Sequence, residues 1–230
     1  ALAAPLHNSL IHVSTAGEDI GSVGVESSPF STIQAAIDYS ISGDTVLVQP
    51  GTYVENINFN GKNIVVGSLL LTTQDTSYIS QTRVDGNATT SVFTFSSNES
   101  SAAALIGLTI QNGGGTVHGG GVHCVNSSPR LSDLRISDSY VVGNGGGLWF
   151  DGYTGIINRV TLAGNTAVGE GGGAFIQNSD VDFNQCSIVD NTAGGSGGGL
   201  DIRSETQSKI VNSLIARNQC SYEGGGFIIN

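Results

Sequence analysis

The sequence predicts an all-β fold in which the chain winds through coils of about 26 residues, a parallel β-solenoid. Three observations predict this fold. The 230 residues include 34 glycines, and Gly-Gly-Gly recurs at nearly constant steps. Apolar residues occupy the same positions after each triplet. The stretches between them contain Asn, Asp and Ser at corner positions and show no helical stripe.

The glycine triplets set the length of the repeat. They begin at Gly119, Gly145, Gly171, Gly197 and Gly224, at steps of 26, 26, 26 and 27 residues. Glycine adopts positive φ without strain and allows the backbone of one coil to lie close to the next. We therefore expect each triplet to form a corner, with successive coils stacked at about 4.8 Å.

Two apolar columns follow each triplet, at the fourth and sixth positions of the unit. They contain Val122, Leu148, Ala174, Leu200 and Phe227, and then Cys124, Phe150, Ile176, Ile202 and Ile229. A variable residue lies between them, and this period of two is typical of a strand that buries one face. Further apolar columns, which include Leu131 and Ile136, continue the predicted core.

Polar columns mark other corners of the predicted coil. One column contains Ser139, Asn165, Asn191 and Asn218. We expect its asparagines to form a ladder in which side-chain amides bond from coil to coil at a turn. A second column holds Asp138 and Asp190 with Gly164 between them, and these carboxylates are predicted to cap corners.

The N-terminal part predicts a different kind of segment. Ser31 and Gln34 fit a capping box, and residues 32–40 place Ile33, Ala36 and Ile37 on one face of a short helix. Strands are predicted at 45–48, 57–59 and 64–66. We expect the helix to cover the open end of the first coil.

The organisation that follows is one β-solenoid domain over residues 1–230. An N-terminal arm and capping helix occupy 1–44, irregular coils occupy 45–118, and glycine-triplet coils occupy 119–230. The last unit stops after Phe227, Ile228 and Ile229 without a polar cap, so these residues are predicted to form an end-to-end contact.

A family resemblance supports the same fold. Residues 29–66, PFSTIQAAIDYSISGDTVLVQPGTYVENINFNGKNIVV, resemble the opening of secreted right-handed parallel β-helix proteins of the pectate-lyase-like superfamily. The triplet units resemble bacterial β-helix repeats and, in part, the repeats of chlamydial polymorphic outer-membrane proteins. The resemblance implies a right-handed coil. It does not fix an activity, because the superfamily contains lyases, hydrolases, esterases and adhesins.

Charge and composition narrow the partners and the location. The formal net charge is −11 with only 8 Lys and Arg, which disfavours nucleic acid and anionic membranes as partners. No apolar run is long enough to cross a bilayer. The start Ala1–Pro5 is similar to the remnant of a signal-peptide cleavage region, and the chain has no Met, so it is predicted to be processed or incomplete. We expect a secreted, extracellular or cell-surface protein.

No catalytic constellation can be assigned. The segments typical of polygalacturonases are absent, and Asp180 and Asp182 lie two residues apart without an evident basic partner. No catalytic residue, metal site or cofactor is predicted, and Ca²⁺ lacks support beyond its use by related lyases. His118, His123 and Cys124 leave metal binding open as an alternative, although they straddle the glycine corner.

Three cysteines, Cys124, Cys186 and Cys220, cannot all pair with one another and show no metal-site spacing. They are predicted to act as small apolar residues. A disulfide or a metal site remains the alternative.

The column between the two inward columns is the candidate binding surface. It contains His123, Trp149, Phe175, Asp201 and Ile228. These side chains should point outward and stack from coil to coil, with Asp151, Tyr153 and Arg203 nearby. Such a row could bind sugar rings or a protein partner. The alternative is a stripe covered by other parts of the chain.

Two functional hypotheses follow. The first is a non-catalytic extracellular β-helix with a structural, adhesin-like or fibre-forming role, whose partners are other copies of itself end to end, a downstream region of the same protein, or a polysaccharide. The second is a pectate-lyase-like enzyme acting on polysaccharide, or a fragment of one.

Overall fold

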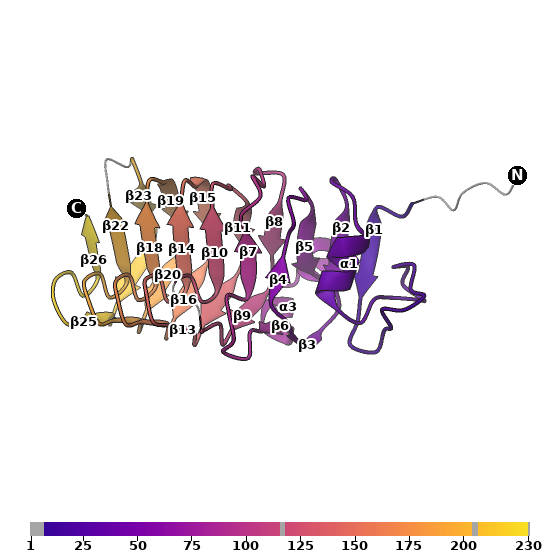
Figure 1. Cartoon of the computed structure of the whole chain (residues 1–230), viewed down its shortest axis with the longest axis horizontal. Helices are drawn as coiled ribbons and strands as arrows, with labels where there is room; N and C mark the ends of the chain where they lie inside the picture. Colours follow the sequence, from indigo (N-terminus) through magenta and orange to yellow (C-terminus); the bar gives the residue numbers. More distant parts are fainter. Residues whose placement is uncertain (1–6, 116–117, 204–206, 230) are drawn as a thin grey trace, which may run out of the picture.

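The structure, a computed structural model, describes residues 7–115, 118–203 and 207–229. It is a right-handed parallel β-helix whose strands stack along one long axis, from the indigo N-terminal coils to the yellow C-terminal coils (Figure 1). All pairings between its named strands are parallel, for example β10 with β14 and β14 with β18. The predicted fold class is confirmed.

Three sheets run the length of this helix, and a fourth, short sheet accompanies its C-terminal coils. The eight-stranded sheet contains β1 (Leu10–Val13), β2 (Thr45–Val48), β5 (Val65–Ser68), β8 (Ala104–Ile106), β11 (Arg130–Ser132), β15 (Thr154–Asn158), β19 (Asp180–Asn184) and β23 (Lys209–Val211). The β10 sheet contains β4 (Ile57–Asn58), β7 (Phe93–Phe95), β10 (Val122–Val125), β14 (Leu148–Asp151), β18 (Ala174–Gln177), β22 (Leu200–Arg203) and β26 (Phe227–Ile229).

The third sheet also extends along the molecule, whereas the fourth is confined to the C-terminal coils. The β12 sheet contains β3 (Gly51–Val54), β6 (Thr82–Asp85), β9 (Thr109–Gln111), β12 (Arg135–Ser137), β16 (Thr161–Ala163), β20 (Ser187–Val189) and β24 (Leu214–Ala216). The β13 sheet contains only the two-residue strands β13 (Tyr140–Val141), β17 (Thr166–Ala167), β21 (Thr192–Ala193) and β25 (Gln219–Cys220).

The predicted inward columns form the core. Their registers match the sequence alignment, and the members from β10 to β22 are buried, including Val122, Leu148 and Phe150 at 0% exposure. In β26, Phe227 and Ile229 are 49% and 61% exposed. Each coil therefore contributes side chains to one continuous apolar interior, and its neighbours on both sides bury them.

The three glycines of a triplet meet different physical demands. The first has positive φ, as at Gly171 with φ 64°. A Cβ on the second, Gly172, would lie 2.4 Å from the carbonyl oxygen of Gly198 in the next coil. A Cβ on the third, Gly173, would lie 2.5 Å from the carbonyl oxygen of Gly199. A left-handed backbone and close contact between coils thus fix the triplet, as the sequence predicts.

The asparagine column lies inside the coil next to this corner. Asn165 donates through Nδ2 to Oδ1 of Asn191 (3.1 Å), and Asn191 donates in the same way to Asn218 (2.9 Å). Each side chain also accepts or donates to backbone groups of adjacent coils, and Asn165 and Asn191 are fully buried. This ladder supplies partners to backbone groups that the turn leaves without strand partners.

Two further corners use residues in the left-handed region. One column contains Gly107, Asp133, Arg159, Gln185 and Asn212, and the other contains Asn112, Asp138, Gly164, Asp190 and Arg217, all with positive φ. Gly164 therefore does not interrupt the column of Asp138 and Asp190, because all three share one backbone conformation. The two exposed arginines each make a bidentate pair with the aspartate of another coil, Arg159 with Asp133 and Arg217 with Asp190.

The N-terminal helix α1 (Ile33–Tyr39) buries Ile33, Ala36 and Ile37 as predicted. Its N-cap is Thr32, whose side chain accepts from the Ala35 N–H, so the prediction of a capping box at Ser31 is wrong. The cause is that an aspartate, Asp19, takes the backbone N–H groups of the two residues before the helix.

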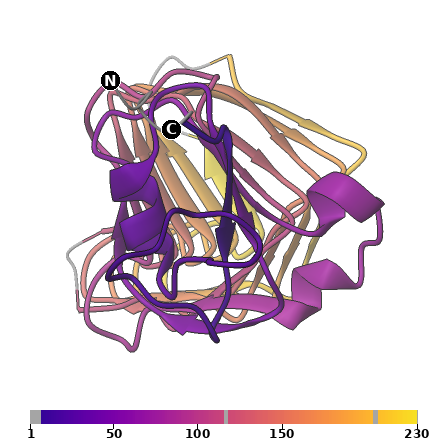
Figure 2. The same cartoon turned by 90° about the vertical axis from the view of Figure 1, so that its right-hand side faces the viewer.

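The arrangement of the first coils departs from the prediction in one respect. The arm contains a strand, β1, which pairs with β2 and extends the eight-stranded sheet by one coil. Helix α1 contacts β1, β2 and β4 along the side of this coil, and the loop between β1 and α1 crosses the end that faces the viewer in Figure 2. The predicted remnant of a signal-peptide cleavage region, residues 1–5, lies outside the described residues.

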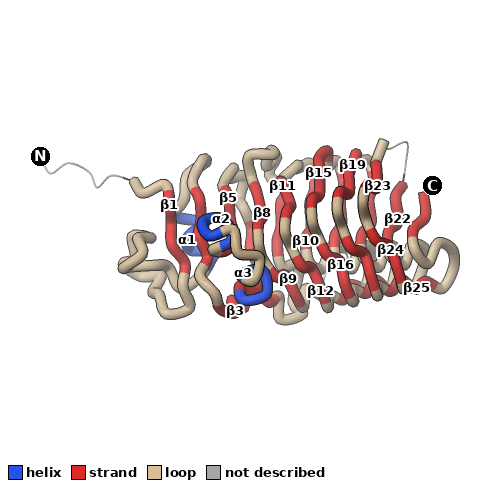
Figure 3. The backbone as a smooth tube through the Cα atoms, turned by 180° about the vertical axis from the view of Figure 1, so that it is seen from behind, coloured by secondary structure: helices blue, strands red, loops and turns tan. Residues whose placement is uncertain are grey.

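A short insertion stands out from the N-terminal coils. Helices α2 (Leu70–Thr73) and α3 (Tyr78–Gln81), which the sequence analysis does not predict, lie outside β5, β8 and β6 (Figure 3). A Cβ on Gly67 or Gly107 would lie within 3 Å of a leucine side chain of α2, so this helix packs directly on β5 and the β8 corner. None of the helices in the described ranges is long and apolar enough to cross a membrane.

Candidate functional site

The predicted exposed aromatic row is covered. His123, Trp149 and Phe175 pair in register on β10, β14 and β18, outside the core cluster, as expected. Trp149 and Phe175 are, however, only 7% and 4% exposed. The glycine corner passes over the row: a Cβ on Gly145 would lie 3.0 Å from the Cβ of Trp149. The expectation that this row offers free ring faces is therefore wrong.

Two imidazoles stack on the indole of Trp149. The ring centroid of His123 lies 4.8 Å away and that of His118 lies 5.0 Å away. Burial lowers the pKa of both histidines, and the nearby His118 lowers the pKa of His123 further. The His118 Nδ1 accepts a hydrogen bond from the backbone N–H of Asn144 (3.2 Å), which requires that nitrogen to be unprotonated. The cluster therefore supports the corner with neutral rings.

The remaining residues of the predicted site are also structural. Asp201 is fully buried and accepts from Arg203 (2.9 Å), which pairs with Glu170 as well and lies over the Phe175 ring. Burial raises the pKa of Asp201, and the hydrogen bond and charge of Arg203 oppose this shift. Ile228 pairs with Asp201 at the next strand and is half-buried.

Asp151 and Tyr153 lie at separate places. Asp151 accepts from the side chains of Gln177 (3.0 Å) and Asn178 (2.8 Å) at a corner. Tyr153 points into the core, is fully buried and donates to the Pro129 carbonyl oxygen (3.0 Å). The structure thus does not bring the predicted binding residues together on one accessible surface.

The cysteines lie apart from one another and none forms a disulfide. Cys124 and Cys186 are buried, and their thiols donate to backbone carbonyl oxygens. Burial raises the pKa of both thiols. They fill the core as small apolar residues would.

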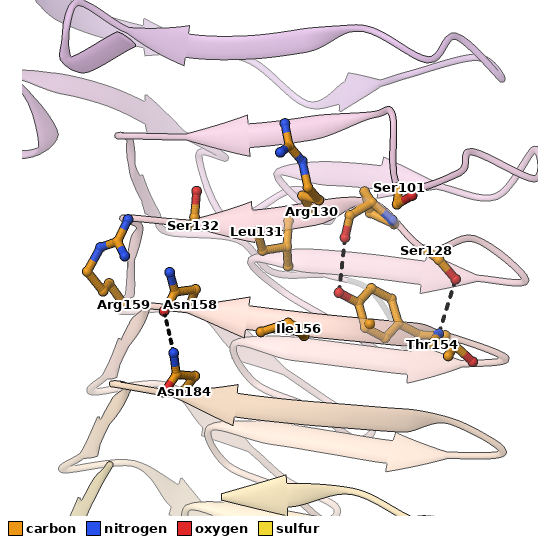
Figure 4. A pocket seen from close by; sticks show the side chains of 13 residues that line it. Ser101, Ser128, Arg130, Leu131, Ser132, Thr154, Ile156, Asn158, Arg159 and Asn184 are labelled. Atoms are coloured by element: carbon orange, nitrogen blue, oxygen red, sulfur yellow. Dashed lines mark hydrogen bonds between the residues drawn. The ribbon is translucent and has the colours of Figure 1, made fainter. Parts of the chain in front are cut away.

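A pronounced hollow lies elsewhere, on the outer face of the eight-stranded sheet over β11, β15 and β19 (Figure 4). We call it the groove. Its volume is about 630 Å³, and its lining consists of Ser101, Ser128, Pro129, Arg130, Leu131, Ser132, Tyr153, Thr154, Gly155, Ile156, Asn158, Arg159 and Asn184. Four successive coils contribute to it, those of β8, β11, β15 and β19, because these strands are neighbours in the sheet.

The groove begins where the insertion ends. Helix α2 lies on the outside of β5 and β8, and the sheet face is open from β11 onward (Figure 3). Ala104 precedes Arg130 in the same column and is fully buried, whereas Arg130 is exposed. The insertion thus covers neighbouring strands on the N-terminal side, although none of its residues lines the groove.

The lining combines hydrogen-bonding groups with one exposed apolar side chain. Ile156 is 57% exposed at the centre of the groove. The Asn184 amide donates to Asn158 Oδ1 (3.0 Å), and the Thr154 backbone N–H donates to the Ser128 hydroxyl (3.1 Å), which fixes these groups along the groove (Figure 4). Such a surface can bind a ligand with many hydroxyl groups.

The sequence analysis missed the groove because its columns are not uniform. The outward positions of β11 and β15 change from Arg130 to Ile156 in one step, so no repeated residue type marks the face. One signal was present. Ile156 is an apolar residue at an outward strand position, between the polar residues Thr154 and Asn158, and it could have pointed to a binding face.

Comparison with known proteins gives both structural and family matches. Pectin methylesterase from Aspergillus niger is 16% identical, with 99% of this chain and 82% of the enzyme covered and a TM-score of 0.45. A rhamnogalacturonan lyase is 15% identical, with 94% of this chain and 62% of the lyase covered and a TM-score of 0.48. No curated protein sequence matches the chain.

The family match spans most of the chain. It covers residues 37–229, from α1 to the last strand, and so includes every glycine triplet and the groove. A parallel β-helix over the same residues agrees with the pectate-lyase-like resemblance of the N-terminal segment. The chain belongs to the family described as NosD, periplasmic copper-binding protein.

Proposed function

We propose that this protein is a non-catalytic, extracytoplasmic β-helix that binds a hydroxyl-rich polymer, such as a polysaccharide, in the groove. The observation that carries the proposal is the chemistry of the lining, which holds hydroxyls, amides, guanidinium groups and Ile156 but no Asp, Glu, His or Cys. The description of the family as periplasmic supports a location outside the cytoplasm.

The groove lining itself lacks a group that could transfer a proton near neutral pH, which favours binding over catalysis. The nearest carboxylates, Asp180 and Asp182, line an adjoining hollow and project from one strand, β19, rather than from two sides of a bound chain. Arginine stays protonated. Burial raises the pKa of Tyr153 well above its ordinary value, and its hydroxyl is engaged with Pro129. General acid–base catalysis needs a titratable group within hydrogen-bond reach of the substrate, and sugar hydrolysis commonly uses two carboxylates.

The shape of the groove suits an extended ligand. Each coil advances by about 4.8 Å and presents one outward residue of each column, so a polymer lying across the strands would meet a similar set of positions at each step. Adhesion to a surface polymer is the role that such a binding face would serve.

Copper, the metal in the family description, does not fit the donors of this chain. Copper ligands are thiolates, thioethers and imidazoles. The sequence has no Met, 3 Cys and 4 His. The thiols of Cys124 and Cys186 are buried and donate hydrogen bonds to backbone carbonyl oxygens, and His118 and His123 stack on Trp149. No group of three or more His, Cys, Asp or Glu side chains in the described part of the chain could hold a metal. No step of the proposal uses copper.

A binding screen tests the proposal. The protein would be titrated with neutral, acidic and amino-bearing polysaccharides of matched length, while release of reducing ends and unsaturated products is followed. We expect saturable binding without product. Ile156→Asp should weaken binding about tenfold, since it places a desolvated charge against the ligand.

The matched control is Val142→Asp, which changes a comparably exposed apolar residue on another face. It should bind as the parent does. Product formation would favour the enzyme hypothesis instead. Equal losses of binding in the two variants would show that the groove is not the binding site.

A further inference from the structure

The groove changes charge along the axis of the β-helix. One outward column of the eight-stranded sheet contains Arg130 on β11, Ile156 on β15, Asp182 on β19 and Lys209 on β23. Its side chains therefore run from a cation through an apolar residue to a carboxylate, which is followed by the ammonium of Lys209. Residues in one column face the same direction from successive coils, so a single bound ligand can meet all of them.

The β11 end of the groove carries one uncompensated positive charge. Arg159 is held by Asp133 through two hydrogen bonds of 2.6 and 2.7 Å, which balances its charge. Arg130 is exposed, and no carboxylate among the described residues pairs with it. A free guanidinium facing a hollow is suited to a carboxylate or another planar anion.

The β19 end carries the opposite charge. A second hollow of about 230 Å³ is lined there by Thr154, Gly155, Ile156, Asp180, Asp182, Gln207 and Lys209. It shares three of these residues, 154–156, with the groove, so the two hollows adjoin each other at β15. Two carboxylates face one ammonium, which leaves a net charge of −1. The Asp182–Lys209 pair, at 3.9 Å and solvent-exposed, is weak.

We infer that the groove binds a dipolar polymer in one direction, with an anionic group of the ligand at Arg130 and a cationic amino group at Asp180 and Asp182. The two ends lie two coils apart, about 10 Å. The ligand class is a hydroxyl-rich chain, such as a sugar polymer, that carries both carboxylates and free amines. This inference rests on the proposed function and adds its specificity.

Charge opposition explains why a uniform polyanion is the weaker ligand. Its carboxylates would be attracted to Arg130 and repelled by the carboxylates at the other end. A uniform polycation would be repelled by Arg130 and attracted to the carboxylates at the other end. Only a ligand that has both charges can satisfy both ends at once.

The test uses four oligosaccharide probes of equal length. They are N,O-carboxymethyl chitosan, which carries carboxylates and amines, polygalacturonate, chitosan and dextran. Binding would be measured by calorimetry at low and high salt. We expect the carboxymethyl chitosan to bind most tightly, by about fivefold over either singly charged probe, because each exposed charge contact contributes about 1 kcal/mol or less. This preference should shrink at high salt.

Two charge-removing variants assign the ends. Arg130→Gln should weaken binding of carboxymethyl chitosan and polygalacturonate and leave chitosan unchanged. Asp182→Asn should weaken carboxymethyl chitosan and chitosan and strengthen polygalacturonate. The control is Arg135→Gln, an exposed arginine on β12 outside the groove. All variants should nearly keep the parent's thermal unfolding temperature, because Arg130 and Arg135 are exposed and Asp182 makes only a weak ion pair at 3.9 Å.

The outcomes separate the inference from the proposed function. If polygalacturonate binds as tightly as carboxymethyl chitosan, or if Asp182→Asn fails to strengthen it, the dipolar preference is wrong while polymer binding stands. If none of the four probes binds, dextran included, the proposed function fails, and the inference fails with it.

Discussion

The glycine corner and the groove face belong to the same coils but follow opposite rules. At the corner, Gly146, Gly172 and Gly198 occupy one column, because each would place a Cβ within 3 Å of backbone in the next coil. On the groove face, one column changes from Arg130 to Ile156 to Asp182. Contact between coils makes the corner uniform, whereas solvent on the outer face leaves each residue free to differ. Uniform columns therefore stabilise the fold, whereas the variable outward columns can carry the residues that bind a ligand.

The largest effect should come from breaking the corner. Gly172→Ala would place a Cβ 2.4 Å from the Gly198 carbonyl oxygen, so backbone must move. We expect a loss of about 3 kcal/mol or more in the free energy of unfolding, measured by urea titration. Gly164→Ala is the matched control. Its Cβ would meet only an aspartate oxygen at 3.1 Å, and its φ of 68° should cost about 1 kcal/mol. Equal losses would show that contact between coils is not what fixes the triplet.

The asparagine ladder offers the next largest contrast with the groove face. Asn191→Ala would leave the buried Asn165 N–H groups and the Leu162 carbonyl without their partners. We expect a loss of about 2–3 kcal/mol in stability. Asn184→Ala, which removes one half-buried bond to Asn158 in the groove, should cost about 1 kcal/mol or less. Thermal unfolding followed by circular dichroism would compare the two, and a larger loss at Asn184 would contradict the comparison.

The corner should also respond to pH in a way that the groove does not. The pKa values of His118 and His123 lie below the ordinary 6.5, chiefly because of burial. The unfolded chain therefore binds these protons more readily, so their contribution to stability is present above pH 6.5 and is lost as pH falls through the folded-state values.

Trp149 is the only tryptophan and stacks on both rings, so its fluorescence should report the change. The double variant His118→Gln, His123→Gln should flatten the pH dependence of stability just below pH 6.5. An unchanged slope in that variant would mean that other groups cause the loss.

The smallest effects on stability are expected on the groove face. Arg130→Gln changes an exposed residue and Asp182→Asn a half-buried one, and within the described ranges the ion pair involved is the 3.9 Å contact of Asp182 with Lys209. Each should shift the free energy of unfolding by less than about 0.5 kcal/mol. Denaturant titration of both variants would check this, and a loss as large as that of Asn191→Ala would assign the face a structural role.

The same contrast explains how much the sequence could predict. The coil length, the inward columns and the triplet corner repeat at fixed steps, so they were predictable. The left-handed corners at Arg159 and Arg217 were not, because these residue types do not indicate positive φ. In each case the arginine side chain donates to an aspartate of another coil, Arg159 to Asp133 and Arg217 to Asp190, and this ion pair is what the arginine supplies at the corner.

The candidate site was harder to predict than the fold. Alternation correctly placed Trp149 and Phe175 outside the core, but it could not show that the glycine corner folds over them. The groove combines Ser101, residues 128–132, 153–156, 158 and 159, and Asn184, which lie far apart in the sequence and meet only when the coils stack. It also depends on differences between coils, which a search for repeats averages out.

Chemical footprinting of the bound protein tests the central claim most directly. Arginine-specific and carboxyl-specific labelling, read by mass spectrometry, would be compared with and without carboxymethyl chitosan. We expect the ligand to protect Arg130, Asp180 and Asp182 from labelling, while Arg135 keeps its labelling rate and Trp149 fluorescence does not change. Unchanged labelling at Arg130 together with a change at Trp149 would contradict this expectation and return the binding site to the glycine corner.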